Sequence, residues 1–175
     1  MTPPSAPGPL ALSRRVLAIL IRLNIVAGVL IAALLLASLL AKGFVMQALG
    51  IPGDAEHVAL FPGMQLIMVL GIVAVPITHA VLSRLLAIVE TVRVGEPFVV
   101  RNAERLKQIA WAVLVLEVLH LVIAGVASGV STPRAPIDIT WDFSIARWLT
   151  VLLLFVLARV FESGARMRAD LEGTV

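Results

Sequence analysis

Four long apolar stretches constrain the fold of this chain more than any other feature. They cover residues 16–41, 61–94, 103–130 and 143–162. A helix of about 20 residues crosses the roughly 30 Å hydrocarbon core of a bilayer, where peptide groups find no water and must bond to one another. The pattern predicts an all-α integral membrane protein with four transmembrane helices, the second of which continues as a cytoplasmic extension.

Composition supports this prediction and excludes several classes of protein. Hydrophobic residues make up 60% of the chain and charged residues 14%, a balance unlike that of a soluble domain. The absence of cysteine excludes disulfides, thiolate metal sites and thiol catalysis. The chain has no tyrosine and no basic stripe interleaved with aromatics, so direct nucleic-acid binding is not expected. Residues 1–13, with four prolines, are predicted to form a disordered tail, and 14–175 a single membrane domain.

The distribution of Lys and Arg predicts the orientation in the membrane. Eleven of these residues flank the first end, the connection between spans two and three, and the last end, against three on the other side. The positive-inside rule then places both termini in the cytoplasm. The expected architecture is a four-helix bundle of two helical hairpins, joined by a cytoplasmic connection. A composition rich in Ala and Arg indicates a bacterial protein, which is then expected in the inner membrane. The lipid bilayer is one predicted partner.

The cytoplasmic connection holds the best candidate for an interaction motif. Gly95 and Pro97 are expected to end one helix, and Asn102 to cap the next. Phe98 and Leu106 share a helical face with Asn102, while Arg105 is expected to point elsewhere. This pattern is typical of a structural hairpin whose basic residues reach lipid phosphates, and also of a docking surface for a soluble regulator. The candidate residues are Gly95, Pro97, Phe98, Asn102, Arg105 and Leu106.

A second candidate is an intramembrane polar site. Glu117 and His120 are three residues apart in the third apolar stretch, so they share one helical face and should turn away from lipid. His79 on the second stretch is a possible partner. The group is either a proton-sensitive or ligand-binding site, or an interhelical hydrogen bond that fixes packing. With His57 added, the ligand types would suit a metal, but only Glu117 and His120 have helical spacing, so no metal or cofactor is predicted.

Two short motifs resemble the bacterial membrane-protein family called domain of unknown function 2975 (DUF2975). The first reads GEPFVVRNAERLKQIAW and the second, at the end of the chain, RMRADLEGTV. The resemblance implies a small four-span protein without an assigned activity. It also implies a partner, because members are often encoded beside a helix-turn-helix regulator. The matching residues are Gly95, Pro97, Phe98, Asn102, Ala103, Arg105, Leu106, Phe161, Gly164, Leu171, Thr174 and Val175.

Two functions follow as hypotheses. The first is a non-enzymatic signalling or regulatory protein that presents a cytoplasmic surface to the helix-turn-helix regulator. The alternative is a small transporter or channel-like protein, or an immunity protein, that uses the face of Glu117 and His120. No nucleophile, base and orienting group stand at recognisable spacing, so no enzyme is predicted. Gly125 and Gly129 form a G-x-x-x-G pattern that suits packing within the chain, with a homodimer as the alternative.

Overall fold

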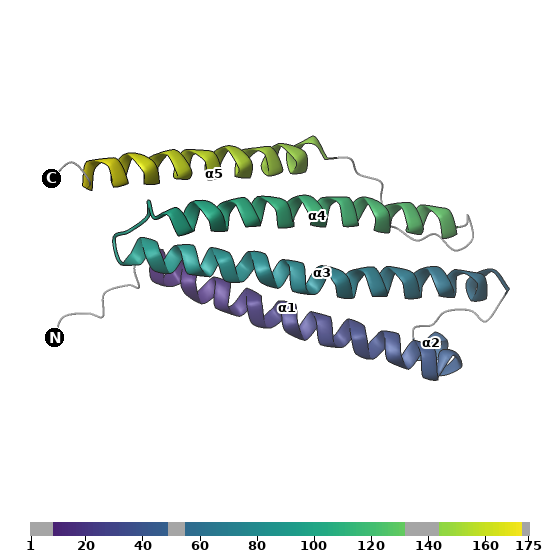
Figure 1. Ribbon diagram of the computed structural model, residues 1–175. Helices are drawn as coiled ribbons and strands as arrows, with labels where there is room; N and C mark the ends of the chain where they lie inside the picture. Colours follow the sequence, from purple (N-terminus) through teal and green to yellow (C-terminus); the bar gives the residue numbers. More distant parts are fainter. Residues whose placement is uncertain (1–8, 49–54, 132–143, 173–175) are drawn as a thin grey trace, which may run out of the picture.

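The computed structural model confirms the all-α prediction and describes residues 9–48, 55–131 and 144–172. Within those ranges every regular element is a helix, and no strand occurs. Four of the helices are long and the remaining one, α2, has seven residues (Figure 1). The elements are α1 (Pro9–Leu40), α2 (Lys42–Ala48), α3 (Ala55–Arg93), α4 (Val100–Val130) and α5 (Ile145–Glu172).

Three of the helices are long and apolar enough to cross a membrane, which supports a multi-pass membrane protein. These segments are Leu10–Leu40, Leu60–Arg93 and Val100–Val130, in α1, α3 and α4. The fourth long helix, α5, is not among them. Its run between Arg147 and Arg159 has no charged side chain, but these 11 residues extend only about 16 Å, roughly half of the hydrocarbon core.

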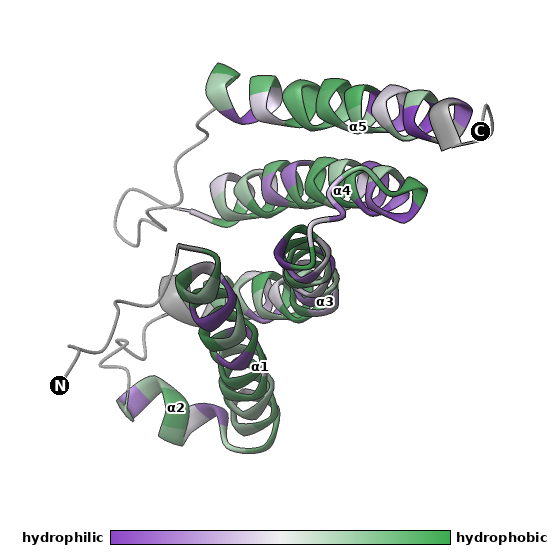
Figure 2. Ribbon diagram, turned by 90° about the vertical axis from the view of Figure 1, so that its left-hand side faces the viewer, coloured by the Kyte–Doolittle hydropathy of each residue, from purple (hydrophilic) through white to green (hydrophobic). Residues whose placement is uncertain are grey.

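The long helices stand in an open row, and the predicted four-helix bundle is not closed. Each packs only against its neighbours in the order α1, α3, α4, α5, and the outer helices α1 and α5 do not touch (Figures 1 and 2). A soluble chain would close such a row to hide its apolar faces. In hydrocarbon that driving force is absent, because lipid tails cover apolar side chains as well as a neighbouring helix does.

Several boundaries differ from those expected. The helix α1 begins at Pro9, so residues 9–13 of the predicted tail are helical, and residues 1–8 lie outside the described ranges. Proline is favoured in the first turn of a helix, and the Leu and Ala that follow are strong helix formers. The stretch between the first two predicted spans carries α2, and α3 begins at Ala55, before the predicted start of the second span at residue 61. The helix α5 continues to Glu172, well beyond the predicted end of span four.

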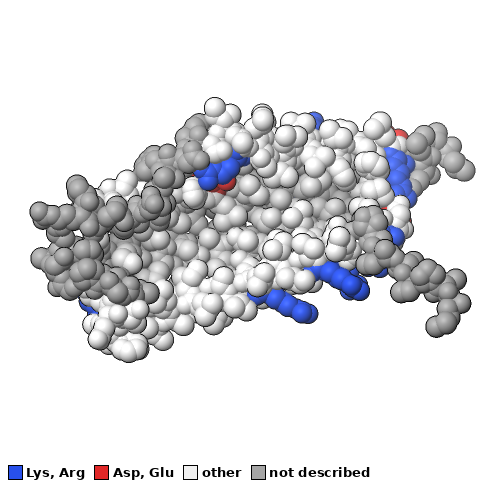
Figure 3. Space-filling model, turned by 180° about the vertical axis from the view of Figure 1, so that it is seen from behind, with Lys and Arg blue, Asp and Glu red and all other residues white. Residues whose placement is uncertain are grey.

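One end of the molecule is rich in basic residues, and we call it the basic end. It brings together the start of α1, the turn between α3 and α4, and the end of α5 (Figure 1). Seen from behind, most of the surface is uncharged and the Lys and Arg atoms gather toward this end (Figure 3). With 39 residues, α3 is about 58 Å long, almost twice the hydrocarbon thickness, so part of it projects beyond the bilayer.

The helices α1 and α3 approach each other closely at Val75. The side-chain amide of Asn24 donates a hydrogen bond of 3.0 Å to the Val75 carbonyl, next to Pro76. One helical turn along α1, a Cβ added to Gly28 would lie 2.8 Å from Val75 Cγ1. The absence of a side chain at Gly28 therefore lets the two backbones approach.

A leucine at Gly28 should separate α1 from α3. Valine has one strongly preferred rotamer in a helix and cannot turn away from the new side chain, so we expect a loss of about 1–3 kcal/mol in stability, as for other overpacked contacts. Gly129→Leu is the matched control, because no atom of the described residues lies within 4 Å of a Cβ added there. Thermal unfolding of the detergent-solubilised protein measures both. Equal unfolding temperatures for the two variants would contradict this account of the contact.

Candidate functional site

The turn between α3 and α4 is a helix stop followed at once by a new helix. Gly95 has a φ of 82°, which a side chain would disfavour. Its amide donates to the Val92 carbonyl at 3.1 Å and the Glu96 amide donates to the Thr91 carbonyl at 3.0 Å, the pair of bonds of a Schellman motif. The helix stop expected at Gly95 is therefore present.

Asn102 is the centre of a buried polar network and does not cap α4. The cap position is Val99, which makes no side-chain cap bond. Asn102 has no exposed surface, and its amide donates to Thr91 Oγ1 at 2.7 Å and to the Pro97 carbonyl at 3.0 Å. Its oxygen accepts a bond of 2.9 Å from Arg105. The network thus ties the end of α3 to the first turns of α4.

Arg105 and Leu106 also face inward. Arg105 was expected to point away from the apolar face, yet its guanidinium donates to the Ala87 carbonyl of α3 at 3.1 Å. A carbonyl oxygen has two lone pairs, so that of Ala87, inside α3, can accept from Arg105 in addition to its bond within the helix. Leu106 is buried, with 5% of its surface exposed. Leu106 is therefore packed inside the hairpin, and the half-buried Arg105 links α4 to α3.

Phe98 joins the hairpin to α5. Its ring centroid lies 5.3 Å from that of Phe161, and a Cβ added to Gly164 would lie 3.0 Å from Phe98 Cδ1. Phe161 and Gly164 belong to the residues that carry the family resemblance, as does Phe98. Thr174 and Val175 lie outside the described residues, as does the side chain of Leu171. The two halves of the resemblance thus meet in one packing unit.

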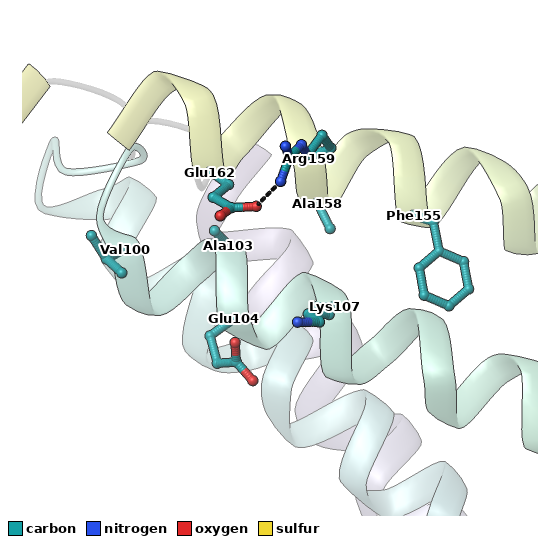
Figure 4. A pocket seen from close by; sticks show the side chains of 8 residues that line it. All are labelled: Val100, Ala103, Glu104, Lys107, Phe155, Ala158, Arg159 and Glu162. Atoms are coloured by element: carbon teal, nitrogen blue, oxygen red, sulfur yellow. Dashed lines mark hydrogen bonds and ion pairs between the residues drawn. The ribbon is translucent and has the colours of Figure 1, made fainter. Parts of the chain in front are cut away.

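A groove between α4 and α5 opens at the basic end, and we call it the α4–α5 groove. It has a volume of about 300 Å³, with Ala103, Ala158 and Phe155 as its apolar part. Figure 4 shows Phe155 pointing from α5 toward α4, and both helices supplying charged side chains to the rim. Glu162 accepts bonds from Arg159 at 3.0 Å and from Arg166 at 2.6 Å. The remaining lining residues are Val100, Glu104 and Lys107.

Glu117 and His120 meet a cation that was not expected there. Arg147, in the first turn of α5, lies with Nε 3.5 Å from Glu117 Oε2 and Nη1 3.2 Å from His120 Nε2. A guanidinium only donates, so Nε2 of His120 accepts and the proton of the neutral ring is on Nδ1. One arginine therefore links two polar groups of α4 to the start of α5.

This cluster lies at the level of the middle of α4. Glu117 is 13 residues before Val130, so α4 runs about 20 Å beyond it, and α5 begins beside the middle of α4 (Figure 1). The predicted partner His79 lies in a separate groove with Arg84 and Gln108, and no hydrogen bond joins it to Glu117 or His120 in the described part of the chain. The structure thus brings together two of the three predicted residues.

A metal is not needed to explain this cluster. Among the residues the structure describes, no three of His, Cys, Asp and Glu come together, and the side chain of His57 lies outside them. A cation binding Glu117 and His120 would have to displace the Arg147 guanidinium from both. The donor set therefore suits an internal ion pair better than a metal.

One feature of the sequence could have identified Arg147 as a site residue, but no feature could have identified the α4–α5 groove. An arginine followed by a long apolar run is a charge that needs a partner at membrane depth, but only the packing of α5 on α4 identifies the partner. The groove depends on the register between the two helices.

A family model described as "Protein of unknown function (DUF2975)" matches residues 49–175. The matched region contains α3, α4 and α5 and leaves out α1 and α2. No curated protein and no solved structure matches the chain.

Proposed function

Because this chain belongs to the DUF2975 family, whose description assigns no activity, we propose its function from its geometry. It is a non-enzymatic regulatory membrane protein that holds a cytoplasmic partner in the α4–α5 groove. The partner we propose is the helix-turn-helix regulator that the family resemblance implies. The observation that carries the proposal is the groove itself, an apolar floor with a charged rim at the basic end.

The proposed orientation puts the basic end in the cytoplasm of a bacterial cell, with the protein in the inner membrane. The start of α1, the α3–α4 turn and the end of α5 share that end, and the positive-inside rule assigns it to the cytoplasm. Helices α1, α3 and α4 cross the bilayer, and α5 is the fourth membrane segment, which returns the chain to the cytoplasmic side. Both termini are then cytoplasmic.

The groove suits a protein partner because it combines apolar and charged groups. Val100 at its edge is 69% exposed and Met167, further along α5, is 62% exposed. Each helix supplies one basic and one acidic side chain to the rim, Lys107 and Glu104 from α4 and Arg159 and Glu162 from α5 (Figure 4). An amphipathic helix could place apolar anchors on the floor and pair its charges with the rim.

Reversing two charges of the rim should abolish partner capture without unfolding the protein. In Lys107→Glu/Arg159→Glu the rim becomes wholly acidic, and like charges across an interface weaken binding by roughly tenfold or more. The measurement is co-purification, from co-expressing cells, of the helix-turn-helix protein encoded beside the gene. Both side chains are exposed, so thermal stability should stay near that of the wild type.

The matched control reverses two charges at the same end, outside the groove. Arg15→Glu/Arg101→Glu changes the net charge equally, and neither residue lines the groove. It should capture the partner as the wild type does. If both variants lose partner capture equally, capture depends on the overall positive charge of the basic end and not on the groove. If the wild type captures no partner, the regulatory proposal is wrong.

A second candidate function, a small transporter, is favoured by one observation. The Glu117, His120 and Arg147 cluster stands at the start of α5 and at the level of the middle of α4. Transporters place substrate and ion sites near the bilayer midplane, often at the ends of interrupted helices. The described helices stand in an open row and do not enclose a path, so we expect this function to need an oligomer. Proton or solute flux in reconstituted vesicles that falls in Glu117→Ala would favour it.

A further inference from the structure

A pocket between the first turns of α1 and the end of α3 carries more positive charge than its neighbours neutralise. Its volume is about 260 Å³, and Arg14, Arg15 and Arg93 line it. Glu90 is the acid beside it, with an oxygen 2.8 Å from Arg14 Nε and the other 2.9 Å from Arg93 Nη1. Among the described residues, these three guanidinium groups and one carboxylate leave a formal charge of +2 around the pocket.

The side of the pocket formed by α1 leaves room for a small anion. Ala11 and Ala18 complete the lining, and they share a face of α1 with Arg15 because they lie four and three residues from it. Their small side chains leave room beside the guanidinium groups. A tetrahedral phosphate offers several acceptor oxygens to arginines, which bind it with two parallel bonds.

A fourth arginine extends the site toward the hydrocarbon. Arg22 is seven residues beyond Arg15 on the same face, about 10 Å deeper along α1. It is exposed, and no hydrogen bond or ion pair joins it to another described residue. Its neighbours Ile19 and Leu23 are 54% and 57% exposed. A charge on such a surface extends toward the phosphate layer of the bilayer.

We propose that this pocket binds the headgroup phosphate of an anionic phospholipid. Arg14, Arg15 and Arg93 contact the phosphate, Arg22 reaches it from below, and an acyl chain lies along the exposed apolar face of α1. The basic side chains on the edge of the molecule formed by α1 project outward, where lipid would stand (Figure 3). Basic pockets between transmembrane helices on the cytoplasmic side suit such headgroups. The site lies on α1 and the end of α3, away from the α4–α5 groove.

The test is native mass spectrometry of the full-length protein in a nonionic detergent, titrated with phosphatidylglycerol. Phosphatidylcholine, whose headgroup has no net charge, and inorganic phosphate are the comparison ligands. The variant is Arg15→Gln/Arg22→Gln, because neither side chain bonds to another described residue and the fold should be unaffected. Each basic side chain near an anionic headgroup contributes about fivefold in affinity, so this variant should bind phosphatidylglycerol roughly 30-fold more weakly.

The control variant, Arg101→Gln/Lys107→Gln, removes the same charge at the same end of the molecule from α4. It should bind phosphatidylglycerol within about twofold of the wild type. Equal weakening in the two variants would overturn the site, because the binding would then follow overall charge. Binding of inorganic phosphate as tight as that of phosphatidylglycerol, with displacement of the lipid, would overturn the lipid as the ligand.

Discussion

Replacing Arg147 with methionine should lower the stability of the protein by about 2–4 kcal/mol. The substitution leaves Glu117, whose side chain is only 18% exposed, as a carboxyl group at membrane depth without its cation. It also removes the bond to His120. For a chain of this size the loss corresponds to a fall of roughly 5–12 °C in the unfolding temperature, measured on the detergent-solubilised protein.

A double-mutant cycle separates the ion pair from the rest of the site. Glu117→Leu/Arg147→Met removes both charges, and replacing a buried ion pair by apolar side chains is often neutral or stabilising, so the double variant should recover most of the lost stability. The control is Arg159→Met, because its ion pair with Glu162 is exposed and contributes about 0–1 kcal/mol. Additive losses in the double variant would show that Arg147 and Glu117 do not stabilise the α4–α5 contact through each other.

The lengths of the apolar segments were sufficient to predict the helices, because hydrocarbon allows a peptide chain few other forms. The arrangement of the helices was not predictable in the same way. A helix bundle closes when its solvent makes exposed leucine and valine unfavourable, as water does. Lipid has no such effect. The row of α1, α3, α4 and α5 therefore follows from particular contacts, such as those at Gly28 and Val75.

The candidate sites show the same limit. Sequence spacing placed Glu117 and His120 on one face correctly, but it offered His79 as their partner, because nothing in the sequence gives the level at which α5 begins. At Asn102 the error came from a boundary. The capping rule places asparagine just before a helix, whereas α4 begins at Val100 and turns Asn102 toward Thr91.

Asn102→Leu should cost about 2–4 kcal/mol, comparable with the loss of Arg147. Leucine has a similar volume but makes no hydrogen bond, so the Pro97 carbonyl loses the bond from the Asn102 amide and the Arg105 guanidinium loses an acceptor. Asn102→Asp keeps the acceptor for Arg105 and loses both donors. If the two donated bonds stabilise the hairpin, thermal unfolding should place the aspartate variant near the leucine variant and well below the wild type.

The control is Gln108→Leu on the same helix, whose side chain makes its hydrogen bonds on the exposed surface and should change stability by roughly 0.5 kcal/mol or less. If the aspartate variant is as stable as the wild type, the hydrogen bond from Arg105 alone accounts for the stability that the network contributes.

The same variants bear on function, because Phe98 packs the hairpin against Phe161 at the end of the α4–α5 groove. Asn102→Leu should therefore lose partner capture together with thermal stability, whereas Lys107→Glu/Arg159→Glu should lose capture while its unfolding temperature is unchanged.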